Sequence, residues 1–243
     1  GIVMAIVVIV LLGTGALIIL AIARRQRRDR HFRRIDDLRQ RYGPVIASLL
    51  SQKLEYERGR EVLKGISGID RDQVLEQLCL EKKPTPDQVP ILRRLCEDLG
   101  LVKIWQARLS GQLGLASLRD TFATPEGFLH RFSRLHFLLR AKAADNLGVI
   151  QHRASWPLLV KALEDAHPDV QGVAVRSLSS IQEPASLAPL VERLHRVILK
   201  PSSRLCLRSI KTAVISFPLK QLDGLGPSLA HAHRRIRFLA TDI

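Results

Sequence analysis

Residues 158–181 read LLVKALEDAHPDVQGVAVRSLSSI, and this stretch decides the fold. It places an apolar segment, a polar turn with Asp and Pro, and a second apolar segment in succession, which predicts two helices joined by a short connection. Small side chains such as Ala174 would let neighbouring helices approach closely, and larger ones such as Leu178 would fill the layer between them. Pro168 is expected to end the first helix, and Asp169 to cap the second.

The same pattern recurs from Leu139 to the end of the sequence, which predicts a stack of similar units. Ala143 and Leu147 return thirty-one residues later as Ala174 and Leu178. Further copies place apolar or small residues at Cys206, Ile210, Ile236 and Ala240, and intervening helices are expected over 156–163 and 187–194.

These residues resemble a HEAT repeat, the helix-turn-helix unit of α-solenoids, from about Leu139 to Ile198. The resemblance implies a curved stack that binds proteins. Gln171 stands where such repeats usually have Arg, so a repeat-to-repeat ladder of Arg side chains would be interrupted there. The whole layout also resembles bacterial membrane-anchored HEAT-repeat proteins encoded beside a family 2 glycosyltransferase, which implies, by association, a role in envelope or exopolysaccharide assembly.

The N-terminal segment, residues 1–23, reads GIVMAIVVIVLLGTGALIILAIA and holds no charged residue. As a helix it would span roughly 34 Å, slightly more than the hydrocarbon core of a bilayer, which predicts a transmembrane helix rather than a buried core helix. A cleaved signal peptide would have its positive charges before the apolar run, whereas here they follow it.

The charged flank of this helix predicts its orientation. The arginines that follow directly would lie in the cytoplasm and attract anionic headgroups of the bilayer, and they are Arg24, Arg25, Arg27, Arg28 and Arg30. The sequence therefore predicts a single-pass protein of the cytoplasmic (inner) membrane, with its N-terminus outside and its folded part in the cytoplasm.

The fold class expected for the rest is all-α. Hydrophobic residues make up 46% and aromatic residues only 5%, a balance typical of packed helices, and no segment shows the alternation of a strand. A helix break or kink is expected at Gly43-Pro44, a helix start at Thr85-Pro86-Asp87 and a C-terminal glycine cap at Gly100. The predicted parts are a transmembrane helix (1–23), a basic juxtamembrane segment (24–41), a helical region of divergent repeats or a separate adaptor (42–122), and HEAT-like repeats (123–243).

The sequence carries no recognisable catalytic motif, so neither an enzyme nor a cofactor is predicted. His231 and His233 could offer two imidazoles to a metal, but no third ligand is placed beside them. Cys79, Cys96 and Cys206 form no CxxC pair and are expected to be buried free thiols.

A scaffold that binds a protein partner at the membrane surface is the leading function hypothesis. Candidate exposed contacts on the stack are Arg140, Lys161, Arg176, Arg193 and Arg208. The net charge of +15 keeps open an alternative, a nucleic-acid-binding protein or a DNA glycosylase-like enzyme, although the anchor opposes it. HEAT-like lyases that attach bilins to proteins are a third class. A small-molecule substrate is not expected.

Overall fold

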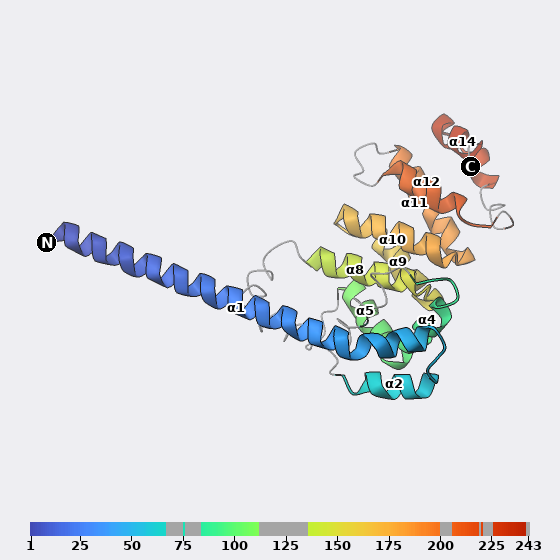
Figure 1. Ribbon diagram of the computed structural model, residues 1–243. Helices are drawn as coiled ribbons and strands as arrows, with labels where there is room; N and C mark the ends of the chain where they lie inside the picture. The colour runs from blue at the N-terminus through green and yellow to red at the C-terminus, as the bar shows by residue number, and fades with distance from the viewer. Residues whose placement is uncertain are drawn as a thin grey trace. The chain divides into compact units, whose positions relative to one another are not determined.

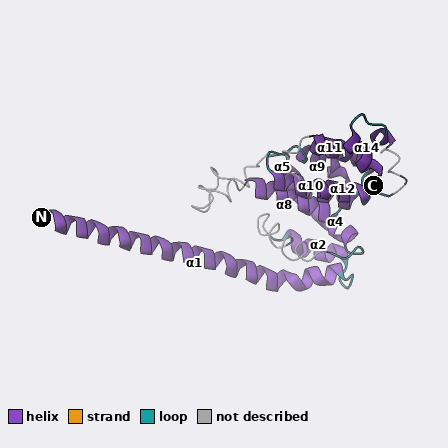
Figure 2. Cartoon of the chain, turned by 90° about the horizontal axis from the view of Figure 1, so that it is seen from above, coloured by secondary structure: helices purple, strands orange, loops and turns teal. Residues whose placement is uncertain are grey.

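The computed structural model describes residues 1–66, 75, 84–111, 136–199, 206–218, 220 and 226–241. Within these residues every regular element is a helix and no strand occurs, which agrees with the all-α prediction (Figure 1, Figure 2). The chain divides into two compact units, Gly1–Leu78 and Cys79–Ile243. Their boundary lies inside the predicted helical region 42–122.

The first unit consists of a long helix, α1 (Ile2–Leu50), and a short one, α2 (Tyr56–Lys64), which packs on its C-terminal part. Leu49 of α1 and Leu63 of α2 are buried. Gly59 allows the close contact between the two helices, because a Cβ at this position would lie 3.3 Å from Cγ of Leu49 and closer still to its Cδ1.

Of the break or kink expected at Gly43-Pro44, the break does not occur, because α1 continues through Pro44 to Leu50. A proline inside a helix removes one N–H and therefore one backbone hydrogen bond of the helix. Ile46 and Leu49, which follow the proline, are both buried. Their burial supplies the stabilisation that offsets the missing bond.

Among the residues whose side chains the structure describes, no helix is both long and apolar enough to cross a membrane. Within residues 1–23, the side chains outside the described set are those at positions 2, 3, 5–10 and 12. The transmembrane prediction for residues 1–23 therefore stays a prediction.

The second unit is a stack of helices in two layers. Its elements are α4 (Val89–Asp98), α5 (Leu101–Leu109), α8 (His136–Val149), η2 (Arg153–Ser155), α9 (Trp156–Ala162), α10 (Pro168–Ile181), η3 (Pro184–Ser186), α11 (Leu187–Leu199), α12 (Leu207–Ile215), α13 (Gly226–Leu229) and α14 (Arg234–Thr241). Helix α10 packs on α8 at one side and on α12 at the other, which makes these three helices one layer. Helices α9 and α11 precede α10 and α12 in the chain and pack against them from the second layer (Figure 1).

Helices α4 and α5 extend this stack on the side of α8. Leu101, Val102 and Trp105 of α5 are buried, and α5 packs on both α4 and α8. Gly100 lies between the two helices with a φ of 75°, which agrees with the predicted glycine cap.

The predicted start of α4 at Thr85-Pro86-Asp87 is wrong by one turn. The helix begins at Val89, with Gln88 as the N-cap and Pro90 in the first helical turn. Thr85 lies in a preceding turn, in which its carbonyl accepts hydrogen bonds from the N–H groups of Gln88 and Val89. The proline that is preorganised for the first turn is therefore Pro90.

The connection between α9 and α10 also differs from its prediction. Helix α9 ends at Ala162, well before Pro168, which occupies the first position of α10. The N-cap is His167, whose Nδ1 accepts a hydrogen bond of 3.3 Å from the N–H of Asp169. A proline is favourable at this first position because its missing N–H would have no partner in the helix. Asp169 instead places a negative charge in the first turn.

The contact between α8 and α10 depends on small side chains. Ala144 and Ala174 are fully buried, as the repeat pattern predicted. Ser177 of α10 donates a hydrogen bond of 2.8 Å from Oγ to the carbonyl of Ala144, and this bond satisfies a buried hydroxyl. Gly148 faces the same serine: a Cβ there would lie 2.6 Å from Cβ and 2.8 Å from Cα of Ser177.

Gly148→Ala is expected to destabilise the second unit by about 1–2 kcal/mol, because overpacking against the α10 backbone outweighs the gain in helix propensity. Gly172→Ala is the matched control, since no atom lies within 4 Å of its added Cβ. The control should stabilise by about 0.5–1 kcal/mol. Urea unfolding followed by far-UV circular dichroism measures both, and equal shifts of the same sign would contradict the close-contact explanation.

Candidate functional site

Arg140 lies in an ion pair at the turn between α9 and α10. Its Nε and Nη2 atoms donate to Oδ2 and Oδ1 of Asp165 at 2.7 and 2.9 Å, and its side chain is only 24% exposed. Burial acts to raise the pKa of Asp165, but hydrogen bonds from Arg140 and from the N–H of His167 outweigh it and lower that pKa below its ordinary value. Arg140 is therefore engaged within the chain and only partly exposed, and its role as a partner contact stays a prediction.

Arg193 holds the same turn from α11. Its side chain is 13% exposed, and its Nη1 lies 3.1 Å from Oε2 of Glu164. Its Nη2 donates a hydrogen bond of 3.1 Å to Oε1 of Gln171, whose Nε2 in turn donates to the carbonyl of Asp165. Arg193 is thus also engaged within the chain, and its role as a partner contact likewise stays a prediction. The ladder of arginines is interrupted at Gln171, as predicted, but a chain of hydrogen bonds continues through the glutamine.

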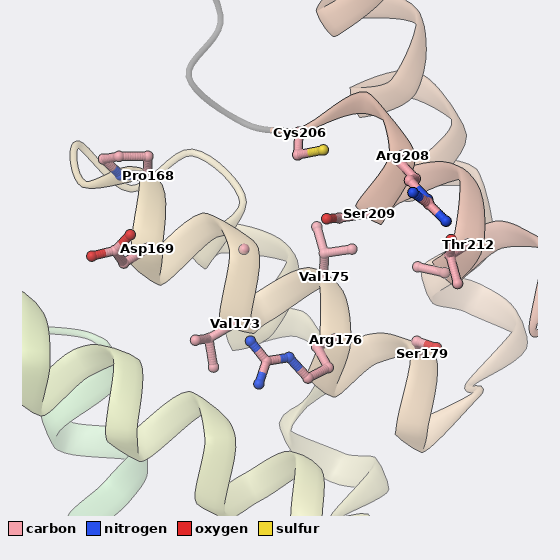
Figure 3. A pocket seen from close by; sticks show the side chains of 12 residues that line it. Pro168, Asp169, Val173, Val175, Arg176, Ser179, Cys206, Arg208, Ser209 and Thr212 are labelled. Atoms are coloured by element: carbon pink, nitrogen blue, oxygen red, sulfur yellow. The ribbon is translucent and has the colours of Figure 1, made fainter.

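The remaining three candidates are exposed. Lys161 lies near the end of α9, whereas Arg176 and Arg208 line a groove between α10 and α12. The groove has a volume of about 720 Å³. Helix α10 contributes lining residues between Pro168 and Ser179, and α12 with its N-cap contributes residues between Cys206 and Ala213 (Figure 3).

The groove combines cationic, hydroxyl and apolar groups. In the part of the chain that the structure describes, neither Arg176 nor Arg208 makes an ion pair with a carboxylate. The hydroxyls of Ser209 and Thr212 belong to exposed residues of α12 that line the groove. Asp169 is the acidic residue in the lining, and its carboxylate lies 3.6 Å from Nδ1 of His167.

Cys206 lies at the groove as the N-cap of α12 and is exposed. The prediction of a buried thiol is wrong for Cys206 and is confirmed for Cys96, while Cys79 lies outside the described residues. Hydrogen bonds from the N–H groups of Ser209 and Arg208 lower the pKa of the Cys206 thiol, with the Ser209 side chain and the charge of Arg208 acting in the same direction. The position therefore stabilises a negative charge.

A Glu–His–Ser constellation occurs elsewhere in the second unit, where it is structural. Nδ1 of His152 lies 2.7 Å from Oγ of Ser155, and its Nε2 lies 3.5 Å from Oε1 of Glu97. Gln106 donates a further hydrogen bond of 2.9 Å to the Ser155 hydroxyl. A nucleophile needs contact with substrate, but Ser155 is 0% exposed. The cluster joins α4, α5 and η2.

The histidines considered as metal ligands have other roles. Nδ1 of His231 accepts a hydrogen bond of 3.0 Å from the N–H of His233, and the His231 ring lies against His195 with centroids 5.2 Å apart. Among the described residues, no group of three or more His, Cys, Asp or Glu side chains could hold a metal ion.

The comparisons with known proteins support the repeat assignment. Residues 126–197 match the family model of HEAT repeats. No curated protein and no solved structure gives a significant match to the chain. The HEAT-repeat prediction is thereby confirmed for the segment around α8 to α11. Repeats of this family generally form helical scaffolds for protein interaction and are generally non-catalytic.

The buried His152 makes the stability of the second unit depend on pH. Burial lowers its pKa, with Arg93 acting in the same direction and Glu97 opposing. The unfolded chain, with an ordinary value of about 6.5, therefore binds the proton more readily, so stability is lost as the pH falls below about 6.5.

His152→Asn removes this titration while it keeps a hydrogen-bonding group beside Ser155. We expect a smaller difference in the urea midpoint between about pH 7.5 and 5.5 than in the unmodified chain. His233→Asn, at an exposed position, is the matched control. An unchanged pH dependence in His152→Asn would contradict the role given to this histidine.

Proposed function

We propose that the chain is a membrane-anchored scaffold, with a folded part in the cytoplasm that binds a protein partner at the membrane surface. The observation that carries the binding role is the HEAT-repeat match, which covers residues 126–197 and includes α10, one of the two helices that line the groove. Such stacks expose extended surfaces on which a partner can be bound. Envelope or exopolysaccharide glycosyltransferase machinery is the partner class suggested by the resemblance described above.

The internal use of Arg140 and Arg193 favours this function over nucleic-acid binding. Both guanidinium groups are engaged by acidic residues of the same chain, so they add little to a phosphate-binding surface. The net charge of the chain is unchanged by these pairs, but fewer of its guanidinium groups are left to contact phosphates.

The membrane anchor is supported by residues 1–23 and by the exposure of apolar side chains on α1. Leu17, Ile18, Ile19 and Leu20 are between 59% and 69% exposed. Removing apolar surface from water stabilises a protein by about 25 cal/mol for each Å², and insertion of these side chains into a bilayer would provide this free energy. The arginines from Arg24 to Arg30 would then lie at the cytoplasmic headgroups.

Deletion of residues 1–23 tests the anchor. The full chain is expected in the membrane fraction after cell lysis and resistant to extraction by high salt, because a spanning helix is held by hydrophobic burial rather than by charge. The truncated chain is expected to leave that fraction or to be released by salt. Retention of the truncated chain through a salt wash would contradict anchoring by this segment.

Site-specific photo-crosslinking in cells tests the binding role. A photoreactive residue at Thr212, which lines the groove, is expected to capture a membrane-associated protein. The same residue at Ala188, exposed on α11 and outside the groove lining, is the control and should capture it far less. Recovery of nucleic acid or nucleoid proteins from both positions would instead support the alternative class.

A further inference from the structure

The arginines of the second unit fall into two groups according to their partners. One group is engaged within the chain: Arg93 of α4 donates to the carbonyl of Ile150, Arg140 of α8 pairs with Asp165, and Arg196 of α11 pairs with Glu164. Arg176 and Arg208 have no such partner within the described residues, and both line the α10–α12 groove. Charge that is not neutralised within the chain is available to a ligand.

The shape of the groove suits side chains of an extended segment. Its volume of about 720 Å³ lies within the usual range of ligand pockets, which is about 300–1,000 Å³. Val175 and Ala213 are buried in its wall and supply an apolar floor, while Ser209 and Thr212 add hydroxyl groups at exposed positions. Figure 3 shows that these residues come from both helices, so the groove depends on the packing of α12 against α10.

The N-terminal ends of two helices lie in the lining of the groove. Pro168 and Asp169 belong to the first turn of α10, and Cys206 is the N-cap of α12. Helix N-termini carry partial positive charge, which adds to the field of Arg208 beside Cys206. The single carboxylate of Asp169 opposes this field only at the α10 end.

We propose that the α10–α12 groove binds an acidic segment of the partner protein, with Arg176 and Arg208 pairing with its carboxylates. This inference rests on the proposed scaffold function and adds the chemistry of the partner. Two arginines and a short apolar floor match a peptide better than a duplex, since nucleic-acid sites commonly contact six to ten phosphates. The groove also lies between two helices and has buried apolar residues in its lining, so it suits the side chains of a peptide better than the flat surface of a bilayer.

Fluorescence anisotropy on the full chain in detergent tests the proposal. The probe is a labelled peptide of alternating Glu and Ser, and the reference probe is the same peptide with Gln in place of Glu. We expect the acidic peptide to bind at least roughly tenfold more tightly at low ionic strength. Equal affinity of the two probes would overturn the proposal. Stronger competition by a DNA duplex, or by glycerol 1-phosphate as a lipid headgroup, would overturn it as well.

Paired charge removals locate the binding. Arg176→Ala with Arg208→Ala is expected to weaken the acidic peptide by about tenfold, because two charge-assisted contacts are lost. Lys103→Ala with Arg153→Ala removes the same net charge at exposed positions outside the groove lining and serves as the control. An equal loss in both double variants would mean that overall charge rather than the groove attracts the peptide, which would overturn the proposal.

Cys206 offers an independent measure of occupancy. In a Cys79→Ser chain, Cys206 is the exposed thiol of the described cysteines, since Cys96 is buried. Bound acidic peptide should slow its alkylation at least severalfold, and an unchanged rate under saturating peptide would overturn the proposal. If photo-crosslinking at Thr212 still captures a partner while the acidic peptide fails to bind, the scaffold function stands and the acidic-segment inference falls.

Discussion

The close approach of α8 and α10 is the constraint on which the rest of the second unit depends. Gly148 leaves room for Ser177, and the Ser177 hydroxyl bonds to the carbonyl of Ala144. A helix pair this close cannot accommodate a larger side chain at the crossing, so the position of α10 relative to α8 is fixed tightly. That position brings Arg140 within reach of Asp165 and presents the opposite side of α10 to α12. The groove between α10 and α12 thus depends on how α10 packs against α8.

The repeat could be predicted from the sequence because its period lies in small and apolar residues. Ala144, Ala174 and Leu178 are buried, and the helix pairs occur where the pattern placed them. The first residue of each helix was harder to predict from the sequence. Several prolines and acidic residues lie near each turn, and more than one of them could mark the N-terminus of the helix. Pro168 and Pro90 both lie at the first turn of a helix. The neighbouring residues alone do not show whether such a proline begins the following helix or ends the preceding one.

The candidate site could be predicted only in part, because its residues are defined by partners distant in the chain. Arg140 and Asp165 are 25 positions apart, and Arg193 and Glu164 are 29 apart. Periodicity places an arginine on a helix surface but does not show whether an acidic side chain of another repeat faces it. The repeat aligns Cys206 with Ala174, which lies inside α10 and is buried. Helix α12, however, begins at Leu207, so Cys206 is its N-cap and is exposed.

The positions of the acidic residues explain which arginines are engaged within the chain and which could bind a ligand. Glu164 and Asp165 lie together in the turn after α9, where they engage arginines from α8 and α11. The exposed pair of Arg196 with Glu164 contributes little to stability, about 0–1 kcal/mol. The part-buried, bidentate pair of Arg140 with Asp165 sets the orientation of the turn. The groove has Asp169 as its acidic residue, and that carboxylate lies near His167. Among the described residues, Arg176 and Arg208 consequently meet no carboxylate. Charges of this kind mainly raise the rate and the selectivity with which an oppositely charged partner is found.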